Sequence, residues 1–417
     1  MKILVVGKGG REHALLKTLQ ASPREVDLYS FPGSDAIFEI ANPTTATDLS
    51  SLIEWMVQEN VELCVAGEES YLVKDEGLAN LCKSHNIPCW GPNKLAAQLE
   101  ASKNFAKEFM FRHDIPTGNS QLVHSFEQGV TAINGKYPTV LKFDGLAAGK
   151  GVAVCPDAES AHAFLDEVFN ERRFGPGDLL VEEFLEGPEV SIFAAVSGSE
   201  FFVFTPARDY KRALENDLGP NTGGMGAVAS RQILSADLMA EIEEKIVTPT
   251  VEGMVKDSFD YKGFLYFGLM LTKDGPKIIE YNCRFGDPEC QAVMPLITGD
   301  FAQFCLNGAQ GNLTPELLEF SNDWSVCVIL ASHGYPVSSR SGDVIFGLEN
   351  LSDEAQLFHA GTKRTPGGEW ATNGGRVLAV VSQGNNRSEA VQKAHKEADK
   401  VTFDGAQRRK DIGIFNF

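Results

Sequence analysis

One glycine-rich segment, residues 137–155, limits most strongly how this chain can fold. Largely apolar, β-branched runs at 139–141 and 152–155 flank a centre that contains several glycines. Such runs on both sides of a glycine-rich centre predict a strand, a loop and a second strand. The residues that give this loop its chemistry are three glycines and two lysines: Gly145, Gly149, Gly151, Lys142 and Lys150.

Glycines let backbone amides approach a ligand without interference from a Cβ atom, and amides together with cations suit a polyphosphate. The loop does not match the phosphate loop of nucleoside triphosphatases. Only three residues separate Gly145 from Gly149, and Gly151 stands where that motif needs Ser or Thr. We therefore predict a polyphosphate-binding hairpin. The residues alone leave open a flexible hairpin with solvated lysines.

The length of 417 residues allows about three domains at ~150 residues each. The formal net charge of −20 argues against a nucleic-acid partner, because phosphate backbones require a basic surface. Lysines and arginines that gather locally could still bind a small anion.

The cysteines are scattered, and no pair has C-x-x-C spacing. Neither a zinc site nor a disulfide framework is expected, and reduced thiols in a cytosolic protein are the simpler interpretation. The apolar run at residues 3–6 is too short for a signal peptide, and no apolar run has the length of a membrane span. The sequence predicts a cytoplasmic protein without a membrane partner.

The N-terminal residues 1–6 are typical of a buried strand, and the segment that begins at Gly7 is typical of a glycine turn followed by a helix. Amides at such a helix start can bind an anion, which makes Gly9 and Gly10 candidate ligand contacts. The dinucleotide fingerprint is only half present, so an ordinary helix start remains the alternative. Repeated strand and glycine patterns predict a small parallel α/β domain to about residue 101.

Near residue 280, polar and apolar side chains alternate. Glu280 and Asn282 are predicted on one strand face, with Ile279 and Tyr281 in the core. Neighbouring carboxylate and amide oxygens are ligands that suit Mg²⁺. A solvated strand face is the alternative, but the Gly/Pro-containing turn that follows is dense in charge: Arg284, Asp287 and Glu289. We therefore predict that Glu280 and Asn282 form a magnesium site.

Two further regions differ from the rest of the sequence in composition and pattern. Residues 208–212 are compactly charged, and residues 219–226 form a glycine loop of the kind that a ligand or a neighbouring domain usually fixes. From about residue 322, strand-like runs and a helix at 388–401 predict a third, α+β domain.

Taken together, the chain resembles the ATP-grasp ligases, and within them the branch that joins glycine to 5-phosphoribosylamine. The resemblance covers essentially the whole chain, and five motifs carry it: residues 7–15, 142–152, 219–227, 280–289 and 372–378. It implies an N-terminal parallel α/β domain over 1–101, an ATP-grasp domain over 102–322 with a mobile lid at about 120–189, and a C-terminal α+β domain over 323–417. The fold class is thus α/β and α+β multidomain.

The resemblance implies formation of glycinamide ribonucleotide, ADP and phosphate from glycine, 5-phosphoribosylamine and ATP, in de novo purine biosynthesis. A glycyl phosphate intermediate, Mg²⁺ or Mn²⁺ as the metal and a monomeric chain are expected. The rivals are another ATP-grasp carboxylate–amine ligase or a carboxylase, a dinucleotide-dependent oxidoreductase, and an inactive nucleotide sensor.

The resemblance also assigns residues. Those expected at ATP are Lys103, Lys142, the loop from Gly145 to Gly151, the hinge Glu182, Glu183, Phe184 and Leu185, and the ribose acceptor Glu189. Those expected at the metal are Glu280 and Asn282. Those expected at the substrates are Gly9, Gly10, Asn221, Thr222, Gly223, Gly224, Met225, Gly226, Arg284, Asp287 and Glu289. Catalytic roles fall to Arg284, Lys142, Asp209 and Lys211. Gly268 stands where many other ATP-grasp enzymes carry a further metal-binding carboxylate.

Overall fold

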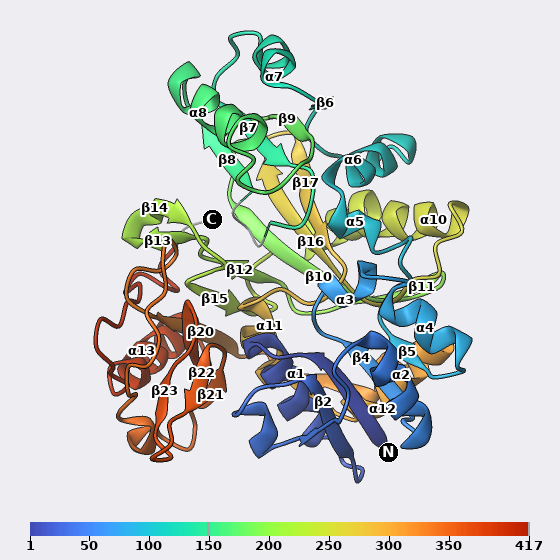
Figure 1. Cartoon of the computed structure of the whole chain (residues 1–417), viewed down its shortest axis with the longest axis vertical. Coiled ribbons are helices and arrows are strands. Elements are labelled where there is room, and N and C mark those ends of the chain that lie inside the picture. The colour runs from blue at the N-terminus through green and yellow to red at the C-terminus, as the bar shows by residue number, and fades with distance from the viewer. Residues whose placement is uncertain (148–150, 416–417) are drawn as a thin grey trace.

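The structure is a computed structural model that describes residues 1–147 and 151–415. Three larger sheets organise it, with five, nine and four strands. In Figure 1 the four-stranded sheet lies at the top, the N-terminal sheet at the bottom, and the long strands of the nine-stranded sheet between them. Among the described residues, no helix combines the length and the apolar character needed to cross a lipid bilayer.

The N-terminal sheet is parallel throughout, with strand order β3-β2-β1-β4-β5, as the sequence predicted. Its central strands are almost wholly buried because helices pack on them, and α12 (Phe301–Gln310) joins from far along the chain by contacting β4 and β5. The elements are β1 Lys2–Gly7, α1 Gly10–Gln20, β2 Asp27–Pro32, β3 Asn42–Pro43, α2 Leu49–Gln58, β4 Leu63–Ala66, α3 Ser70–Val73, α4 Leu78–Ser84 and β5 Cys89–Trp90.

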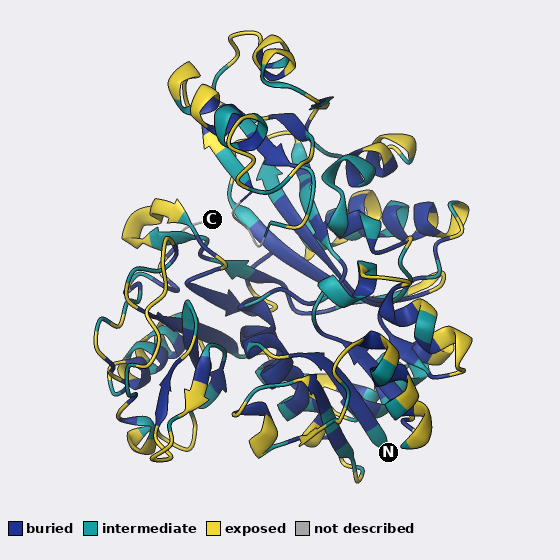
Figure 2. Ribbon diagram, viewed as in Figure 1, coloured by how far each residue is buried: buried dark blue, intermediate teal, exposed yellow. Residues whose placement is uncertain are grey.

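The predicted strand, loop and strand of the glycine-rich segment are confirmed at β7 (Thr139–Phe143) and β8 (Val152–Cys155), which pair antiparallel. They belong to a sheet of order β6-β9-β7-β8 with its own small core, here called the lid sheet. Figure 2 shows exposed residues on the outer surfaces of the two helices that cover it. Its other elements are β6 Ser120–Val123, α7 Phe126–Ile133, α8 Ala158–Phe169 and β9 Leu179–Glu183. Gly149 and Lys150 lie outside the described residues.

The nine-stranded sheet has the order β17-β16-β10-β12-β15-β20-β24-β21, with β11 added beside β10. It runs without interruption from the predicted ATP-grasp segment into the C-terminal segment, because β15 pairs with β20. Its strands are β10 Glu189–Ser197, β11 Glu200–Val203, β12 Ala207–Asp209, β15 Gly226–Ala229, β16 Lys262–Thr272, β17 Gly275–Asn282, β20 Trp324–Ala331, β21 Gln356–His359 and β24 Arg376–Gly384.

The remaining elements flank this sheet. The helices are α5 Gln98–Ala101, α6 Lys103–Arg112, α9 Ala236–Ile242, α10 Thr248–Lys256, α11 Glu289–Val293 and α13 Arg387–Ala398. The short strands pair as β13 Arg212–Leu214 with β14 Leu218–Asn221, β18 Ile297–Gly299 with β19 Leu318–Phe320, and β22 Thr362–Arg364 with β23 Trp370–Thr372. Residues 219–221 of the predicted glycine loop thus belong to the hairpin strand β14, and Gly226 begins β15.

One side-chain prediction on β17 is wrong. The alternation placed Ile279 in the core, but the buried residues are Ile278 and Tyr281, whereas Ile279 is half-buried. The pairing with β16 explains the difference: Gly268 opposes Glu280 and Leu269 opposes Ile278, so Ile279 is the extra residue of a β-bulge. Glu280 and Asn282 still share one face, as predicted.

Two histidines join the N-terminal helix α1 to strand β21 of the C-terminal segment. His13 of α1 accepts a hydrogen bond at Nδ1 from the backbone N–H of His359 in β21, at 3.0 Å. Burial lowers the pKa of His13 to about 3 and that of His359 to about 4. Both rings are therefore neutral in the folded protein at neutral pH.

Acidification is expected to weaken this junction. An unfolded histidine has a pKa of about 6.5, so the unfolded chain takes up protons first, and stability falls as the pH drops from about 6.5 towards 4. Urea unfolding should show that His13→Gln/His359→Gln removes at least about 2 kcal/mol of this pH-dependent loss. The exposed His162→Gln is the control and should keep the wild-type slope. Equal slopes in all three proteins would contradict the assignment.

Candidate active site

Lys142 of β7 and the strand β17 meet at the junction of the lid sheet and the nine-stranded sheet. The Lys142 ammonium donates to the carbonyl of Ile279 at 3.0 Å and pairs with Glu182 Oε2 at 3.0 Å. The Lys142 side chain therefore ends beside Glu280, the residue that follows Ile279 in the sequence. The structure thus brings together the two halves of the predicted site.

Several cations surround Glu280. Burial alone would raise the pKa of this carboxyl, but Lys211, Lys142, Lys103 and Arg284 together hold it below its ordinary value. Glu280 is therefore ionised at neutral pH. A group of cations around one carboxylate is an arrangement that suits a polyanionic ligand and the metal ion that accompanies it.

The start of the glycine loop is fixed to the start of α6. Ser102 caps this helix by accepting from the N–H of Phe105 at 3.1 Å. The Asp144 carboxylate also accepts from the N–H of Lys103 at 2.6 Å and from that of Asn104 at 3.2 Å, where the helix dipole favours an anion. The Lys103 ammonium donates to the carbonyl of Gly145 at 2.9 Å. Lys103 therefore lies at the start of the glycine loop, and its contact with ATP stays a prediction.

Of the predicted hinge, Glu182 and Glu183 are the last residues of β9, and Phe184 and Leu185 continue without regular structure. Glu182 is buried between two lysines, with Lys107 Nζ at 3.1 Å and Lys142 Nζ at 3.0 Å. Its carboxylate thus holds Lys142 in place. Contact between the hinge backbone and adenine stays a prediction.

Acidic groups gather around Lys211. Its ammonium lies 2.9 Å from Glu189 Oε2 and 3.6 Å from Glu280 Oε1. Burial and nearby carboxylates raise the pKa of Asp209 to about 8, although Lys211 opposes the shift. Burial likewise raises the pKa of Glu289, which accepts from Ser191 Oγ at 3.1 Å. Such a group of carboxyls suits a ligand that carries an amine.

Arg284 is held by two carboxylates that the sequence analysis missed. Its Nε donates to Glu69 at 3.1 Å, and its Nη2 lies 2.7 Å from Glu100 Oε1. Despite burial, Arg284 and Arg11 lower the pKa of Glu69 to about 2, whereas burial raises that of Glu100 to about 7. When the Asn282 amide is assigned with its nitrogen facing Glu100, the orientation that its hydrogen-bonding neighbours favour, it donates to Glu100 Oε1 at 2.9 Å. Glu69 therefore orients Arg284, and Glu100 orients both Arg284 and Asn282.

The loop at residues 221–226 is joined to the C-terminal segment by Arg376. Its guanidinium donates to the carbonyls of Gly223 and Asp287 and pairs with the Asp287 carboxylate at 2.9 Å. The N–H of Gly223 donates to Tyr335 Oη at 2.9 Å. Gly224 adopts φ +108°, a conformation that favours glycine, and its N–H donates to Thr222 Oγ1. Arg376, which the sequence analysis placed only within a motif, thus fixes this loop.

The expectation that amides at the start of α1 are free is wrong for Gly9. Its N–H donates to Glu12 Oε2 at 2.7 Å, so a carboxylate of the same helix already occupies this donor. Gly10 lies against Gln291, where an added Cβ would be 2.6 Å from Nε2. Gly9 has no side chain to complete a capping box, but Glu12 at the third helical position supplies the other half of that motif and could have been recognised in the sequence.

The donor set suits Mg²⁺, because Glu280 and Asn282 offer oxygens on one face of β17. Opposite Glu280 stands Gly268, where an added Cβ would lie 3.0 Å from Cγ of Glu280. The facing strand therefore contributes no carboxylate at this point.

The lysine-bearing lid sheet meets the carboxylate-bearing strand as in an ATP-grasp protein, and the family model of an ATP-grasp (A) domain matches residues 101–290. A biotin carboxylase domain of the 2-oxoglutarate carboxylase from Hydrogenobacter thermophilus, crystallised with MgADP and bicarbonate, aligns with a TM-score of 0.74. It covers 97% of this chain and 91% of that domain at 17% identity, so it shows the fold alone.

Family models are more specific. The N, ATP-grasp (A) and C domains of phosphoribosylglycinamide synthetase match residues 1–100, 101–290 and 325–414. A phosphoribosylamine–glycine ligase from Caldanaerobacter subterraneus subsp. tengcongensis is 42% identical over 99% of both chains. The crystal structure of such a ligase from Thermotoga maritima has a TM-score of 0.85 and 32% identity, and the alignment covers 99% of this chain and 100% of that one. The chain belongs to the phosphoribosylglycinamide synthetase family.

Proposed function

We propose that this chain joins glycine to 5-phosphoribosylamine at the expense of ATP, giving glycinamide ribonucleotide, ADP and phosphate in purine biosynthesis. The observation that carries the proposal is the contact of Lys142 with Ile279, which sets a lid lysine beside Glu280. The full-length relatives named as phosphoribosylamine–glycine ligases support the choice of substrates.

ATP would lie between the lid sheet and β17, with Lys103 and Lys142 at its phosphates. Glu280 and Asn282 would hold Mg²⁺, or Mn²⁺, which neutralises phosphate oxygens when it is bound. The glycine carboxylate would attack the γ-phosphorus, so that a bond forms between these atoms and the bond to ADP breaks. The amine of 5-phosphoribosylamine would then displace phosphate from glycyl phosphate.

The protein mainly supplies position and charge for such steps. Arg284 is held by Glu69 and Glu100, and its Nη1 donates to the carbonyl of Phe285 at 3.1 Å. An N–H group left over from these bonds would bind the transferring phosphoryl group or the glycine carboxylate. The carboxyls around Lys211 suit the amino groups of the two substrates. Asp209, whose pKa burial raises to about 8, would exchange a proton with the attacking amine near neutral pH.

We further propose domain boundaries near residues 101 and 322, a lid at about 120–189, and a monomer in the cytoplasm. Because β15 pairs with β20, the nine-stranded sheet continues across the second boundary. This boundary therefore divides the sequence but not the sheet.

An ADP-release assay tests the function directly. We expect release only when ATP, glycine and 5-phosphoribosylamine are all present, and a glycinamide ribonucleotide product in mass spectrometry. Release that depends on bicarbonate instead of glycine would identify a carboxylase, whose fold this chain shares. Binding of NADH would favour the oxidoreductase alternative.

A further inference from the structure

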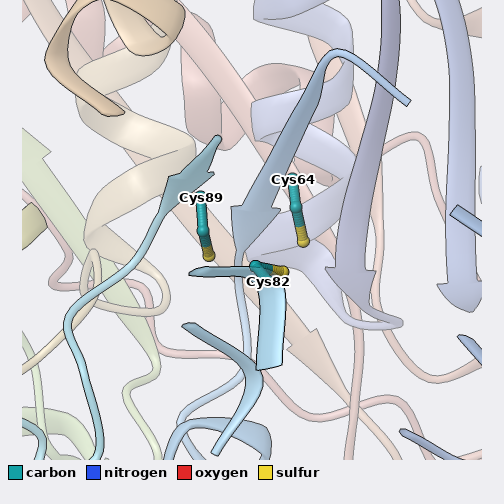
Figure 3. A group of neighbouring side chains, drawn as sticks. All are labelled: Cys64, Cys82 and Cys89. Atoms are coloured by element: carbon teal, nitrogen blue, oxygen red, sulfur yellow. The ribbon is translucent and has the colours of Figure 1, made fainter. Parts of the chain in front are cut away.

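Three cysteines of the N-terminal sheet converge at one point outside the candidate active site. Cys64 lies in β4, Cys82 in α4 and Cys89 in β5. Their Sγ atoms all lie within 4.8 Å of one another, and Figure 3 shows the three side chains gathered between these elements. Within residues 1–147 and 151–415, no other group of three His, Cys, Asp or Glu side chains converges in this way.

Strand pairing explains the convergence. Cys64 and Cys89 are register partners in neighbouring parallel strands, so their side chains leave the sheet on the same face. The helix α4 connects these two strands and places Cys82 over that face. Spacings of 18 and 7 residues in the sequence carry no metal motif, which is why the cluster is not evident there.

The surroundings are apolar and closed. Cys64 and Cys82 are 0% exposed and Cys89 is 8% exposed. An added Cβ on the adjacent Gly91 would lie 2.6 Å from Ala66, 3.3 Å from Leu72 and 3.6 Å from the sulfur of Cys89. Because the three cysteines are buried, we expect no water as a fourth ligand of a bound ion.

Charge also suits a cation. Hydrogen bonds from the thiols of Cys64 and Cys82 lower the pKa of the Cys89 thiol, and the Lys262 ammonium adds to the effect, although burial opposes it. The neighbouring Lys262 ammonium would partly balance the negative charge that a three-sulfur site carries.

We propose that Cys64, Cys82 and Cys89 form a three-coordinate binding site for a soft d¹⁰ metal ion, with Cu⁺ as the favoured ion. Three sulfurs at ~2.3 Å from one ion stand about 4 Å apart, so closure of the cluster needs movements below about 1 Å. Soft thiolates select Cu⁺ and Zn²⁺, but a structural Zn²⁺ takes four ligands, and the described residues supply three.

The test uses the reduced full-length chain, titrated anaerobically with Cu⁺ against a chromophoric chelator. We expect one equivalent of Cu⁺ per chain, three sulfur neighbours in X-ray absorption, and a thermal midpoint raised by about 5 °C. The variant Cys82→Ala should lose the tight equivalent. Cys305→Ala, a buried cysteine of α12 outside the cluster, is the matched control and should keep it.

Parallel titrations with Zn²⁺ and Cd²⁺ distinguish the ions. Tight binding of Zn²⁺ without binding of Cu⁺ would overturn the three-coordinate assignment. So would the absence of tight binding to the wild-type chain, equal binding by Cys82→Ala, or a disulfide within the cluster in the purified protein. If Cys82→Ala does not fold, the sulfur count at the ion in the wild-type chain decides, and fewer than three sulfurs overturns the proposal.

Discussion

Replacing Glu280 with alanine is expected to lower kcat by about 1000-fold, equivalent to about 4 kcal/mol of transition-state stabilisation. The reason is that the variant removes the charged metal ligand and leaves Lys211, Lys142 and Lys103 without the carboxylate that they surround. The strand should remain intact, because Ile278 and Tyr281, which face the core, are unchanged. Steady-state ADP release at increasing Mg²⁺ concentrations measures the effect.

The control is Glu252→Ala, which removes an exposed glutamate of α10 that pairs with Lys256 in the next helical turn. This variant should retain wild-type turnover, and both variants should show the far-ultraviolet circular dichroism of the parent. Near-normal turnover of Glu280→Ala at ordinary Mg²⁺ concentrations would refute the metal assignment.

Lys142→Met is expected to lower kcat/KM for ATP by about 100- to 1000-fold, as the loss of one fixed cation at a phosphate does elsewhere. Methionine preserves much of the length and apolar volume of the buried chain but removes the donor to Ile279 and the partner of Glu182. Calorimetric titration with a non-hydrolysable ATP analogue should show correspondingly weaker binding.

Lys107→Met provides a matched comparison. Lys107 is as buried as Lys142 and pairs with the same carboxylate, but its ammonium also donates to Thr117 Oγ1 and the carbonyl of Gly118, at 2.9 Å each. Each variant leaves Glu182 with one lysine, so we expect similar losses of thermal stability but less than a tenfold loss of kcat/KM in Lys107→Met. Equal catalytic losses in the two variants would show that Lys142 acts through Glu182 and the lid rather than on ATP.

Local patterns predicted the parts of this protein that depend on neighbouring residues. The hairpin of β7 and β8 follows from two strand-forming runs around glycines, and the cap of α6 follows from Ser102. The shared face of Glu280 and Asn282 follows from the two-residue period of a strand. Each of these features is determined within a few residues of sequence.

Features that depend on distant partners could not be predicted in the same way. Glu69 and Glu100 act on Arg284 across 215 and 184 residues of sequence, and Arg376 reaches Gly223 across 153. Their charges were visible in the sequence, but nothing local identified their partners. The bulge at Ile279 was missed because an extra residue in one strand becomes evident only against the strand that pairs with it.

The bulge at Ile279 separates attachment of the lid from metal binding, because the Ile279 carbonyl binds Lys142 whereas Glu280 and Asn282 are the expected metal ligands. Because Ile279 is the extra residue, its removal would leave Ile278, Glu280, Tyr281 and Asn282 in strict alternation, with the carboxylate and the amide still on the same face. What would disappear is the carbonyl that receives the Lys142 ammonium. Evolution could therefore loosen or tighten the attachment of the lid through a single insertion or deletion without altering the ligands of the metal.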